Sequence, residues 1–350
     1  MTKDKSILIK NIYYMLVYAF TNLKQKDIKE IAGEKFDNLH NLLASILANG
    51  ISNQLKQGLY REYINRIDNL TTLRGKIDMS GTIKNFVAGR KVLTCEYDEL
   101  SENNLLNQIL KMTSILLIRH GEVDSKHKAA LKKVMLFFNN VDEINPSSIR
   151  WSSLLLNRNN QTYRLLLNIC QFILKGMLLT TDDGEYKLME FADDQEMCRL
   201  YEKFLLEYYR KEFPQVNASR SQITWALDDN ISDMLPIMQT DIMLTQGNNV
   251  LIIDAKYYTH TTQNYHNTQK LRSDNLYQIF TYVKNKAAEF NPKPRKVSGM
   301  LLYARTDENI QPDNVYQMSG NQISVKTLDL NKDFSEIAAQ LNNIVSDHFK

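Results

Sequence analysis

Apolar residues recur three and four positions apart over much of the first half of the chain, a spacing that places them on one face of a helix. Between the second and third of these helices, residues 58–85 carry turn-prone Asp-Asn and Arg-Gly steps, and Ile77, Met79 and Ile83 alternate with polar residues. We expect short β-strands at the end of that segment. The helices expected in this half cover residues 11–24, 36–57, 103–138 and 161–179.

The polar stretch at residues 180–186 is the candidate linker, and the pattern changes after it. Residues 194–213 predict an amphipathic helix that Pro214 ends. Apolar runs bounded by turn residues then predict strands. We expect a mixed α+β domain over residues 1–185 and an α/β domain over residues 186–350. The strands expected there cover residues 235–244, 249–258, 297–305 and 321–330, with helices over roughly 274–290 and at the end of the chain.

The composition is that of a globular protein, with 43% hydrophobic and 24% charged residues among 350, a length that suits two domains. The formal net charge is only +3, so contact with nucleic acid must come from a local patch. Three widely spaced cysteines form no CxxC pair and fit the reduced thiols of a cytoplasmic protein. The apolar stretch Ile12–Phe20 is too short to cross a membrane.

The residue types that carry chemistry lie on the two strands expected before and after residues 246–248. Asp254 and Lys256 are two positions apart, so their side chains point to the same face of a strand. Asp241 lies on the preceding strand and comes beside Asp254 if the two strands form a hairpin. Two converging carboxylates with water and phosphate make an oxygen site that suits Mg²⁺. Lys256 would orient the attacking water and stabilise the transition state.

This D…D-x-K arrangement is that of the PD-(D/E)xK nucleases, although a bare D-x-K is a weak motif and a solvated pair at a strand end is the alternative. The apolar run at residues 250–253 predicts a buried strand that would hold Asp254 rigidly. Gln278 and Tyr282 follow on one helix face and resemble the Q-x-x-x-Y element of the RecB-like branch. The resemblance implies that the glutamine supports the active site and that the tyrosine contacts the strand. Thr240, not proline, precedes the first acid.

Further candidates flank this set. Glu202 and Glu207 lie on the helix over residues 194–213, where an acid could complete a metal shell. We favour Glu202 because it lies next to the apolar stripe, although a solvated glutamate is at least as good a reading. Residues 257–272 are polar, basic and aromatic and could either track a DNA backbone or form a flexible loop. The residues singled out there for DNA contact are Tyr258, Lys270 and Arg272, whereas His260 and His266 make no convincing metal site.

Several blocks together resemble McrC, the nuclease subunit of the McrBC modification-dependent restriction system. They run in the same order over nearly the whole chain. The resemblance implies that Asp241, Asp254 and Lys256 are catalytic with Mg²⁺, in a PD-(D/E)xK domain over residues 186–350. The blocks are NIYYMLVYAF, RGKIDMSGTIKN, CEYDELSENNLLNQILK, LYEKFLLEYYRKEF, QTDI, IIDAKYY and NLYQIFTYV.

The resemblance also implies partners. A GTP-hydrolysing AAA+ hexamer of the McrB type would read methylated DNA, and residues 1–185 would insert into its ring and stimulate it. Nuclease domains would pair to cut both strands. Two rival hypotheses remain: a stand-alone repair or structure-specific nuclease, and a non-catalytic AAA+ adaptor. The complete triad argues against the adaptor, and the large N-terminal half, with no DNA-reading module, argues against the stand-alone enzyme.

Overall fold

The protein is seen here as a computed structural model, and contacts along the chain divide it into two units. We name the first the sheet unit (Met1–Leu42, Lys175–Leu178 and Met189–Lys350) and the second the helical unit (Leu43–Leu174 and Leu179–Leu188). The first 42 residues thus group with the C-terminal half, which differs from the split expected between residues 185 and 186. The residues described are 3–4, 7–20, 36, 38–154, 163–180, 186–188, 194–229, 231–257, 262–265, 268–290, 295–305 and 311–349.

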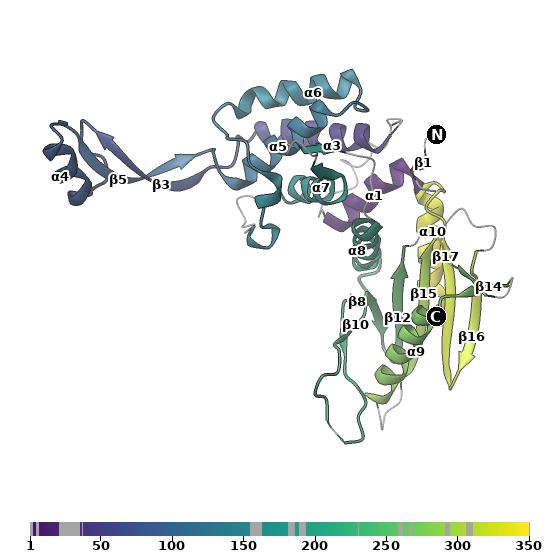
Figure 1. Ribbon diagram of the computed structural model, residues 1–350. Coiled ribbons are helices and arrows are strands. Elements are labelled where there is room, and N and C mark those ends of the chain that lie inside the picture. The colour runs from purple at the N-terminus through teal and green to yellow at the C-terminus, as the bar shows by residue number, and fades with distance from the viewer. Residues whose placement is uncertain are drawn as a thin grey trace. The chain divides into compact units, whose positions relative to one another are not determined.

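A six-stranded mixed sheet forms the centre of the sheet unit, in the order β16-β17-β15-β12-β11-β8 (Figure 1). β12, β15 and β17 are parallel to one another. On one side β11 pairs antiparallel with β12 and β8 pairs antiparallel with β11, and on the other side β16 pairs antiparallel with β17. The apolar run before Asp254 lies in β12, whose inner residues are all buried, as its central place requires. The strands are β8 (Asn217–Ser219), β11 (Ile242–Gln246), β12 (Asn249–Lys256), β15 (Lys296–Ala304), β16 (Asn314–Met318) and β17 (Asn321–Leu328).

Helix α9 (Ser273–Ala288) connects β12 to β15 and packs against one face of the sheet. Its Ile279 and Val283 share a core cluster with Ile252 of β12. The packing is close at Gly299 of β15, where an added Cβ would lie 2.7 Å from Val283 and 2.8 Å from Ile279. Glycine is therefore needed there for the approach of the helix. The expected order of two strands, a helix and a further strand is confirmed.

The N-terminal helix α1 packs on α8, and α8 in turn contacts β8, β11 and β12. Asn11 of α1 is buried, and its Nδ2 donates hydrogen bonds of 2.7 Å to the carbonyl oxygens of Leu330 and Lys332. These contacts tie α1 to the segment that follows the last strand, which is why it belongs to the sheet unit. The remaining helices of this unit are α1 (Ile9–Phe20), α8 (Asp194–Glu212) and α10 (Phe334–His348).

Helices make the core of the helical unit, and one buried tyrosine joins them to the root of a long hairpin. The hydroxyl of Tyr163 accepts a hydrogen bond from the backbone N–H of Tyr60 and donates one to Oδ1 of Asn107, both at 2.8 Å. The helices are α3 (Leu39–Leu55), α5 (Leu105–Arg119), α6 (Ser125–Met135) and α7 (Tyr163–Gly176), with 3₁₀ turns at Leu136–Phe138, Pro146–Ser148 and Trp151–Ser153.

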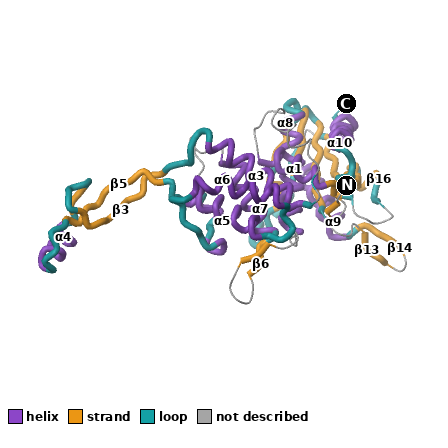
Figure 2. The backbone as a smooth tube through the Cα atoms, turned by 90° about the horizontal axis from the view of Figure 1, so that it is seen from above, coloured by secondary structure: helices purple, strands orange, loops and turns teal. Residues whose placement is uncertain are grey.

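The long hairpin, which we call the arm, extends away from these helices (Figures 1 and 2). β3 (Glu62–Leu70) pairs antiparallel with β5 (Leu93–Ser101) along their full length, and β4 (Lys76–Ile77) adds a short third strand. Most side chains of β3 are exposed, because no layer covers the ribbon. Helix α4 (Met79–Val87) forms its far end.

The strand expected from the alternation at Ile77, Met79 and Ile83 was wrong beyond Ile77. Asp78 ends β4 and caps α4, accepting hydrogen bonds from the N–H groups of Ser80 and Gly81. A capping aspartate satisfies backbone donors of the first helical turn. The apolar residues after it also recur at helical spacing, which the short alternation hid.

Short strand pairs complete the fold. No helix among the described residues has the length and apolar character needed to cross a membrane. The strands of the short pairs are β1 (Lys3–Asp4), β2 (Ile7–Leu8), β6 (Leu178–Thr180), β7 (Tyr186–Leu188), β9 (Gln222–Ile223), β10 (Met238–Gln239), β13 (Thr262–Tyr265) and β14 (Thr268–Leu271).

Candidate active site

Two carboxylates meet where β11 begins and β12 ends. The register pairs Ile242 with Ile253, so Asp241, one residue earlier, stands opposite Asp254. Oδ2 of Asp241 accepts a hydrogen bond of 2.9 Å from the backbone N–H of Ala255. The hairpin expected through residues 246–248 is confirmed, with Gly247 in the left-handed region at φ 56°. The sheet therefore holds both acids side by side.

A β-bulge directs Asp241 toward β12. The register that pairs Gln239 with Gln222 and the register that pairs Met243 with Ser219 differ by one residue. Asp241 and Ile242 together therefore oppose the single residue Arg220, which is the definition of a bulge. Thr240, fully buried, fixes the kink through its N–H and Oγ1, which bond the backbone of Ser221.

Lys256 completes a connected row of side chains. Its Nζ lies 2.9 Å from Oδ2 of Asp254 and donates a hydrogen bond of 3.0 Å to Oε1 of Gln278. Nε2 of Gln278 in turn donates to the hydroxyl of Tyr282 at 3.0 Å. Gln278 and Tyr282 do lie on one face of α9, four residues apart, as the spacing predicts. The row fixes the lysine from both sides.

The electrostatics of this edge favour partial protonation of the acids when no cation is bound. Burial raises the pKa of Asp254 to about 7, with a further increase from the Asp241 charge and an opposing decrease from Lys256. Burial also raises the pKa of Asp241, against the N–H of Ala255 and the Lys256 charge. Glu202 of α8 is affected in the same way: burial and the Asp241 charge raise its pKa to about 7. The charge of Asp241 thus raises the pKa of both of the other two carboxyl groups.

This group of acids fits a divalent cation. Asp254 is 1% exposed, and its Oδ2 lies 2.9 Å from Nζ of Lys256. Burial of several carboxylates together is costly unless cations balance their charge, and one ammonium group cannot balance Asp241 and Asp254 together. Mg²⁺ takes oxygen ligands from one or two carboxylates, so Asp241 and Asp254 are the residues that could hold it, with Glu202 close enough to act on Asp241.

The other expected residues lie at different places. Glu207 forms an ion pair with Arg210 at 2.6 Å. Lys270 is exposed on β14, and Arg272 directly precedes α9. Tyr258, His260 and His266 lie outside the described residues. The segment between β12 and α9 contains the β13–β14 hairpin.

Arg220 is a residue that the sequence analysis missed. It is exposed and follows β8, and its charge lowers the pKa of both Glu202 and Asp241. The segment Asn217–Ser221 has no acidic motif and little apolar character, so no pattern in the sequence pointed to it. Only the pairing of β8 with β11 brings it to the site.

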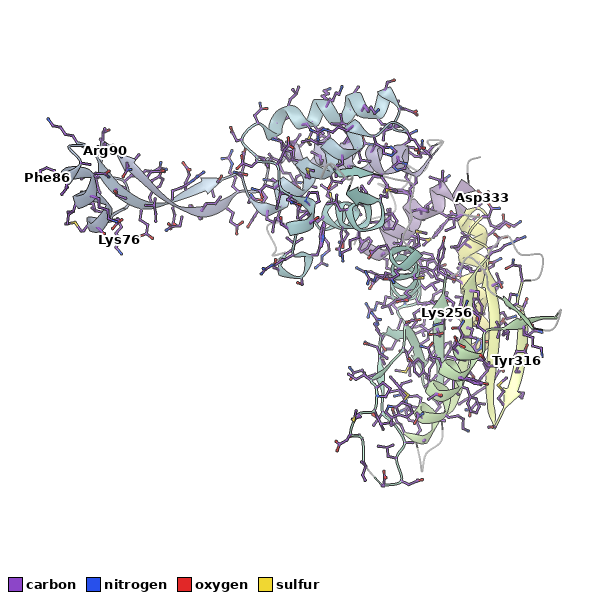
Figure 3. All side chains as sticks on the ribbon, viewed as in Figure 1. Lys76, Phe86, Arg90, Lys256, Tyr316 and Asp333 are labelled. Atoms are coloured by element: carbon purple, nitrogen blue, oxygen red, sulfur yellow. The ribbon has the colours of Figure 1, made fainter. Side chains whose placement is uncertain are left out.

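The helical unit offers a different kind of surface. At the far end of the arm four apolar side chains of α4 are 57–82% exposed, and Phe86 lies there with Arg90 (Figure 3). Exposed apolar groups gathered at one end of an element mark an interaction site. The four residues are Met79, Ile83, Phe86 and Val87.

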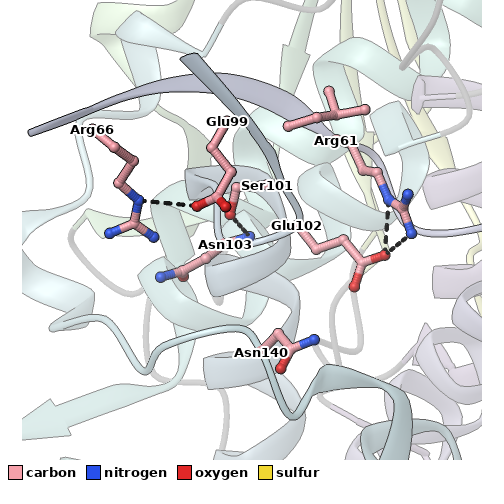
Figure 4. Close-up of a pocket in the computed structure, with 8 residues that line it drawn as sticks. Arg61, Arg66, Glu99, Ser101, Glu102, Asn103 and Asn140 are labelled. Carbon is pink, nitrogen blue, oxygen red and sulfur yellow. Dashed lines mark hydrogen bonds and ion pairs between the residues drawn. The ribbon is translucent and has the colours of Figure 1, made fainter. Parts of the chain in front are cut away.

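A pocket at the root of the arm has matched charges (Figure 4). Arg61 pairs with Glu102 at 2.7 Å, and Arg66 pairs with Glu99 at 3.3 Å. Each arginine of the pocket contacts a carboxylate of its lining, and Glu99 also pairs with Arg74 at 3.7 Å. Because these charges are already engaged within the arm, we interpret the pocket as part of the arm's attachment.

Comparison with known proteins shows the family of the chain. The family described as "McrBC 5-methylcytosine restriction system component" matches residues 2–304. The type IV methyl-directed restriction enzyme EcoKMcrBC of Escherichia coli (strain K12) is 28% identical over 351 residues, which cover 98% of this chain and 99% of the relative.

A solved structure shows a similar fold. It is the refined half-complex from a tetradecameric assembly of Thermococcus gammatolerans McrB AAA+ hexamers with bound McrC, with a TM-score of 0.54 and 19% identity, over 96% of this chain and 76% of that chain. At that identity the likeness concerns the fold alone. Since the family match covers most of the sequence, the chain belongs to the McrBC 5-methylcytosine restriction system component family, as the resemblance to McrC predicted.

Proposed function

We propose that this restriction-system component is a Mg²⁺-dependent DNA endonuclease subunit of the PD-(D/E)xK type. The observation that carries the proposal is the convergence of Asp241, Asp254 and Lys256 at the edge between β11 and β12. When bound, Mg²⁺ would supply positive charge against the phosphate and lower the pKa of water. Asp241 and Asp254 would hold it, and Glu202 is the proposed third acid.

Lys256 has the position expected of a group that acts on the attacking water. Its ammonium is held between Asp254 and Gln278, so little side-chain entropy remains to be lost when substrate arrives. A fixed cation beside the reacting phosphate stabilises the negative charge that develops in the transition state. Gln278, held in place by the hydroxyl of Tyr282, would position the lysine without touching the substrate.

DNA would reach this edge along the segment that leads from β12 to α9. Lys270 and Arg272, with Tyr258, are the residues we propose for contact with the phosphate backbone. A few such contacts on a chain of net charge +3 support only weak binding, with a Kd no tighter than roughly 10⁻⁶ M at physiological salt. The chain alone should therefore depend on a partner for stable engagement.

The partner we propose is an AAA+ GTPase hexamer of the McrB type. The related complex from Thermococcus gammatolerans contains McrB AAA+ hexamers with bound McrC. The apolar end of the arm, with Phe86 and Val87 both more than 80% exposed, supports an insertion of this element into the ring. The partner would read methylated DNA, and pairing of two nuclease domains would give cuts in both strands.

A plasmid digest tests the proposal. We expect cleavage of methylated plasmid when chain, partner, GTP and Mg²⁺ are all present, and none with EDTA or with the Asp254→Asn variant. Vigorous cleavage by the isolated chain, indifferent to methylation, would favour a stand-alone nuclease. A complex that hydrolyses GTP and never cuts would favour a non-catalytic adaptor.

A further inference from the structure

Arg220 is placed beside the candidate active site by the backbone, before any side-chain contact is considered. The bulge sets it opposite Asp241 and Ile242. The hydroxyls of its neighbours Ser219 and Ser221 lie 2.7 Å apart and so share one face. Since successive side chains of an extended strand alternate, the side chain of Arg220 points to the face opposite these two hydroxyls.

The guanidinium of Arg220 differs from those of three other arginines in the sheet unit. Arg199, Arg210 and Arg305 each form an ion pair, with Glu196, Glu207 and Asp329. Arg220 is exposed and forms no hydrogen bond or ion pair with any residue in the described parts of the chain. The strand registers nevertheless place it directly opposite Asp241.

We propose that Arg220 binds a non-bridging oxygen of the DNA phosphate that enters the candidate active site, and so positions the scissile strand against Asp241. The proposal rests on the endonuclease function proposed above. A guanidinium is the side chain best suited to phosphate, because its planar donors match two oxygens at once. An arginine already paired with a carboxylate would have to break that pair first, whereas Arg220 does not.

Its place opposite the bulge fixes the position of the Arg220 backbone relative to Asp241 and Asp254. Asp241, directly opposite, is fixed to β12 through the N–H of Ala255, so the strand that carries Arg220 and the strand that carries Asp254 keep one spacing. Pairing of Ser219 with Met243 on one side and of Ser221 with Thr240 on the other prevents the backbone of Arg220 from moving along the strand. A phosphate bound there would be held beside the acids.

The test uses Arg220→Ala and Arg220→Lys in the full chain, assembled with partner, GTP and Mg²⁺. We expect Arg220→Ala to lower kcat/KM for DNA cleavage roughly 10- to 100-fold, the range of a charge-assisted hydrogen bond, and Arg220→Lys to recover part of that loss. The matched control is Arg295→Ala. Arg295 stacks on the ring of Phe290, with 4.5 Å between the guanidinium carbon and the ring centroid. It directly precedes Lys296, the β15 residue that pairs with Asn249. Asn249 begins β12 and Lys256 ends it, so Arg295 lies at the end of the strand away from the site.

A second measurement distinguishes phosphate binding by Arg220 from a role in which its charge only balances that of the carboxylates. Binding of a short duplex by the isolated chain is followed over a range of salt concentrations. Loss of one phosphate contact should reduce the slope of log K against log salt by about 1 in Arg220→Ala, and not in Arg295→Ala. An unchanged slope with a shifted pH profile of cleavage would overturn the proposal and leave Arg220 as a counter-ion.

The two proposals fail in different ways. If the wild-type complex cuts DNA, Asp254→Asn does not, and Arg220→Ala cuts like the Arg295 control, the endonuclease proposal stands and the role of Arg220 is wrong. If the wild-type complex does not cut, or Asp254→Asn cuts equally well, the endonuclease proposal itself is wrong, and the inference about Arg220 falls with it.

Discussion

Nζ of Lys256 donates a hydrogen bond of 3.0 Å to Oε1 of Gln278, which joins the last residue of a central strand to a helix that begins seventeen residues later. The same glutamine donates to Tyr282. Because an amide has one acceptor end and one donor end, these two contacts fix which way the Gln278 side chain points, and through it the direction of the lysine.

Substitution of Gln278 tests this positioning. Gln278→Ala should lower the single-turnover rate of cleavage roughly 10- to 100-fold, by analogy with the loss of residues that orient a catalytic group, and leave DNA affinity within about twofold. Tyr282→Phe, which removes only the hydroxyl, should have a smaller effect in the same direction. A change in DNA affinity without a change in rate would contradict the positioning role.

Removal of either carboxylate should remove the metal-dependent reaction. Asp241→Asn and Asp254→Asn should each reduce cleavage by the assembled complex to the level seen with EDTA, because each takes one ligand from a two-carboxylate site. The measurement is linearisation of methylated plasmid at fixed Mg²⁺. Asp347→Asn, at an exposed position near the end of α10, is the control and should cut normally. Near-wild-type cutting by either site variant would refute the assignment.

Cutting and stimulation of the partner should separate. Lys256→Ala should eliminate cleavage and leave GTP hydrolysis by the partner ring largely intact, since we place the two tasks in different units. Nicking of plasmid and phosphate release are measured on the same samples. If both activities fell together while circular dichroism showed a folded chain, the division of labour would be wrong.

Substitutions at the apolar end of the arm should reduce stimulation of the partner. Phe86→Ser with Val87→Ser should weaken stimulation of GTP hydrolysis while the chain itself stays folded, because substitutions at exposed positions usually change stability by less than about 0.5 kcal/mol. Phe137→Ser, also at an exposed phenylalanine of the helical unit, is the matched control. Equal stimulation by the double variant and the control would exclude the tip from the partner interface.

The crowded carboxylates predict a pH dependence in the metal-free protein. The pKa of Asp254 is about 7 in the folded chain and close to 3.9 when unfolded. A raised pKa means that the protonated form is favoured by folding, so this stabilisation is complete below about pH 4 and is lost as pH rises through 7. With EDTA, the Tm of the wild type should fall between pH 5 and pH 8 by more than that of Asp254→Asn.

Addition of Mg²⁺ completes this comparison. At pH 8 the cation should raise the Tm of the wild type, because it binds the ionised carboxylates of the folded chain only, and it should leave Asp254→Asn nearly unchanged. If the two proteins showed the same slope with pH and the same response to Mg²⁺, the raised pKa of Asp254 would not be a property of the folded state.

Sequence alone identified the parts of the molecule in which local pattern and tertiary structure agree. The side chains of the apolar run of β12 can be buried on both faces only in the middle of a sheet. The spacing of the apolar residues in α8 and α9 gives each helix one apolar face. The two-residue separation of Asp254 and Lys256 and the four-residue separation of Gln278 and Tyr282 are fixed by strand and helix geometry, so their common faces followed directly.

Other features depended on contacts between distant segments. α4 was mistaken for strand because a few alternating residues fit both periods, and the cap at Asp78 decided between them. Asn11 draws the first helix into the sheet unit by bonding carbonyls more than 300 residues away. The bulge that sets Arg220 opposite Asp241 arises from two strand pairings that differ by one residue. Such a difference does not change the pattern of apolar and polar residues in either strand, because register is a property of the pair of strands.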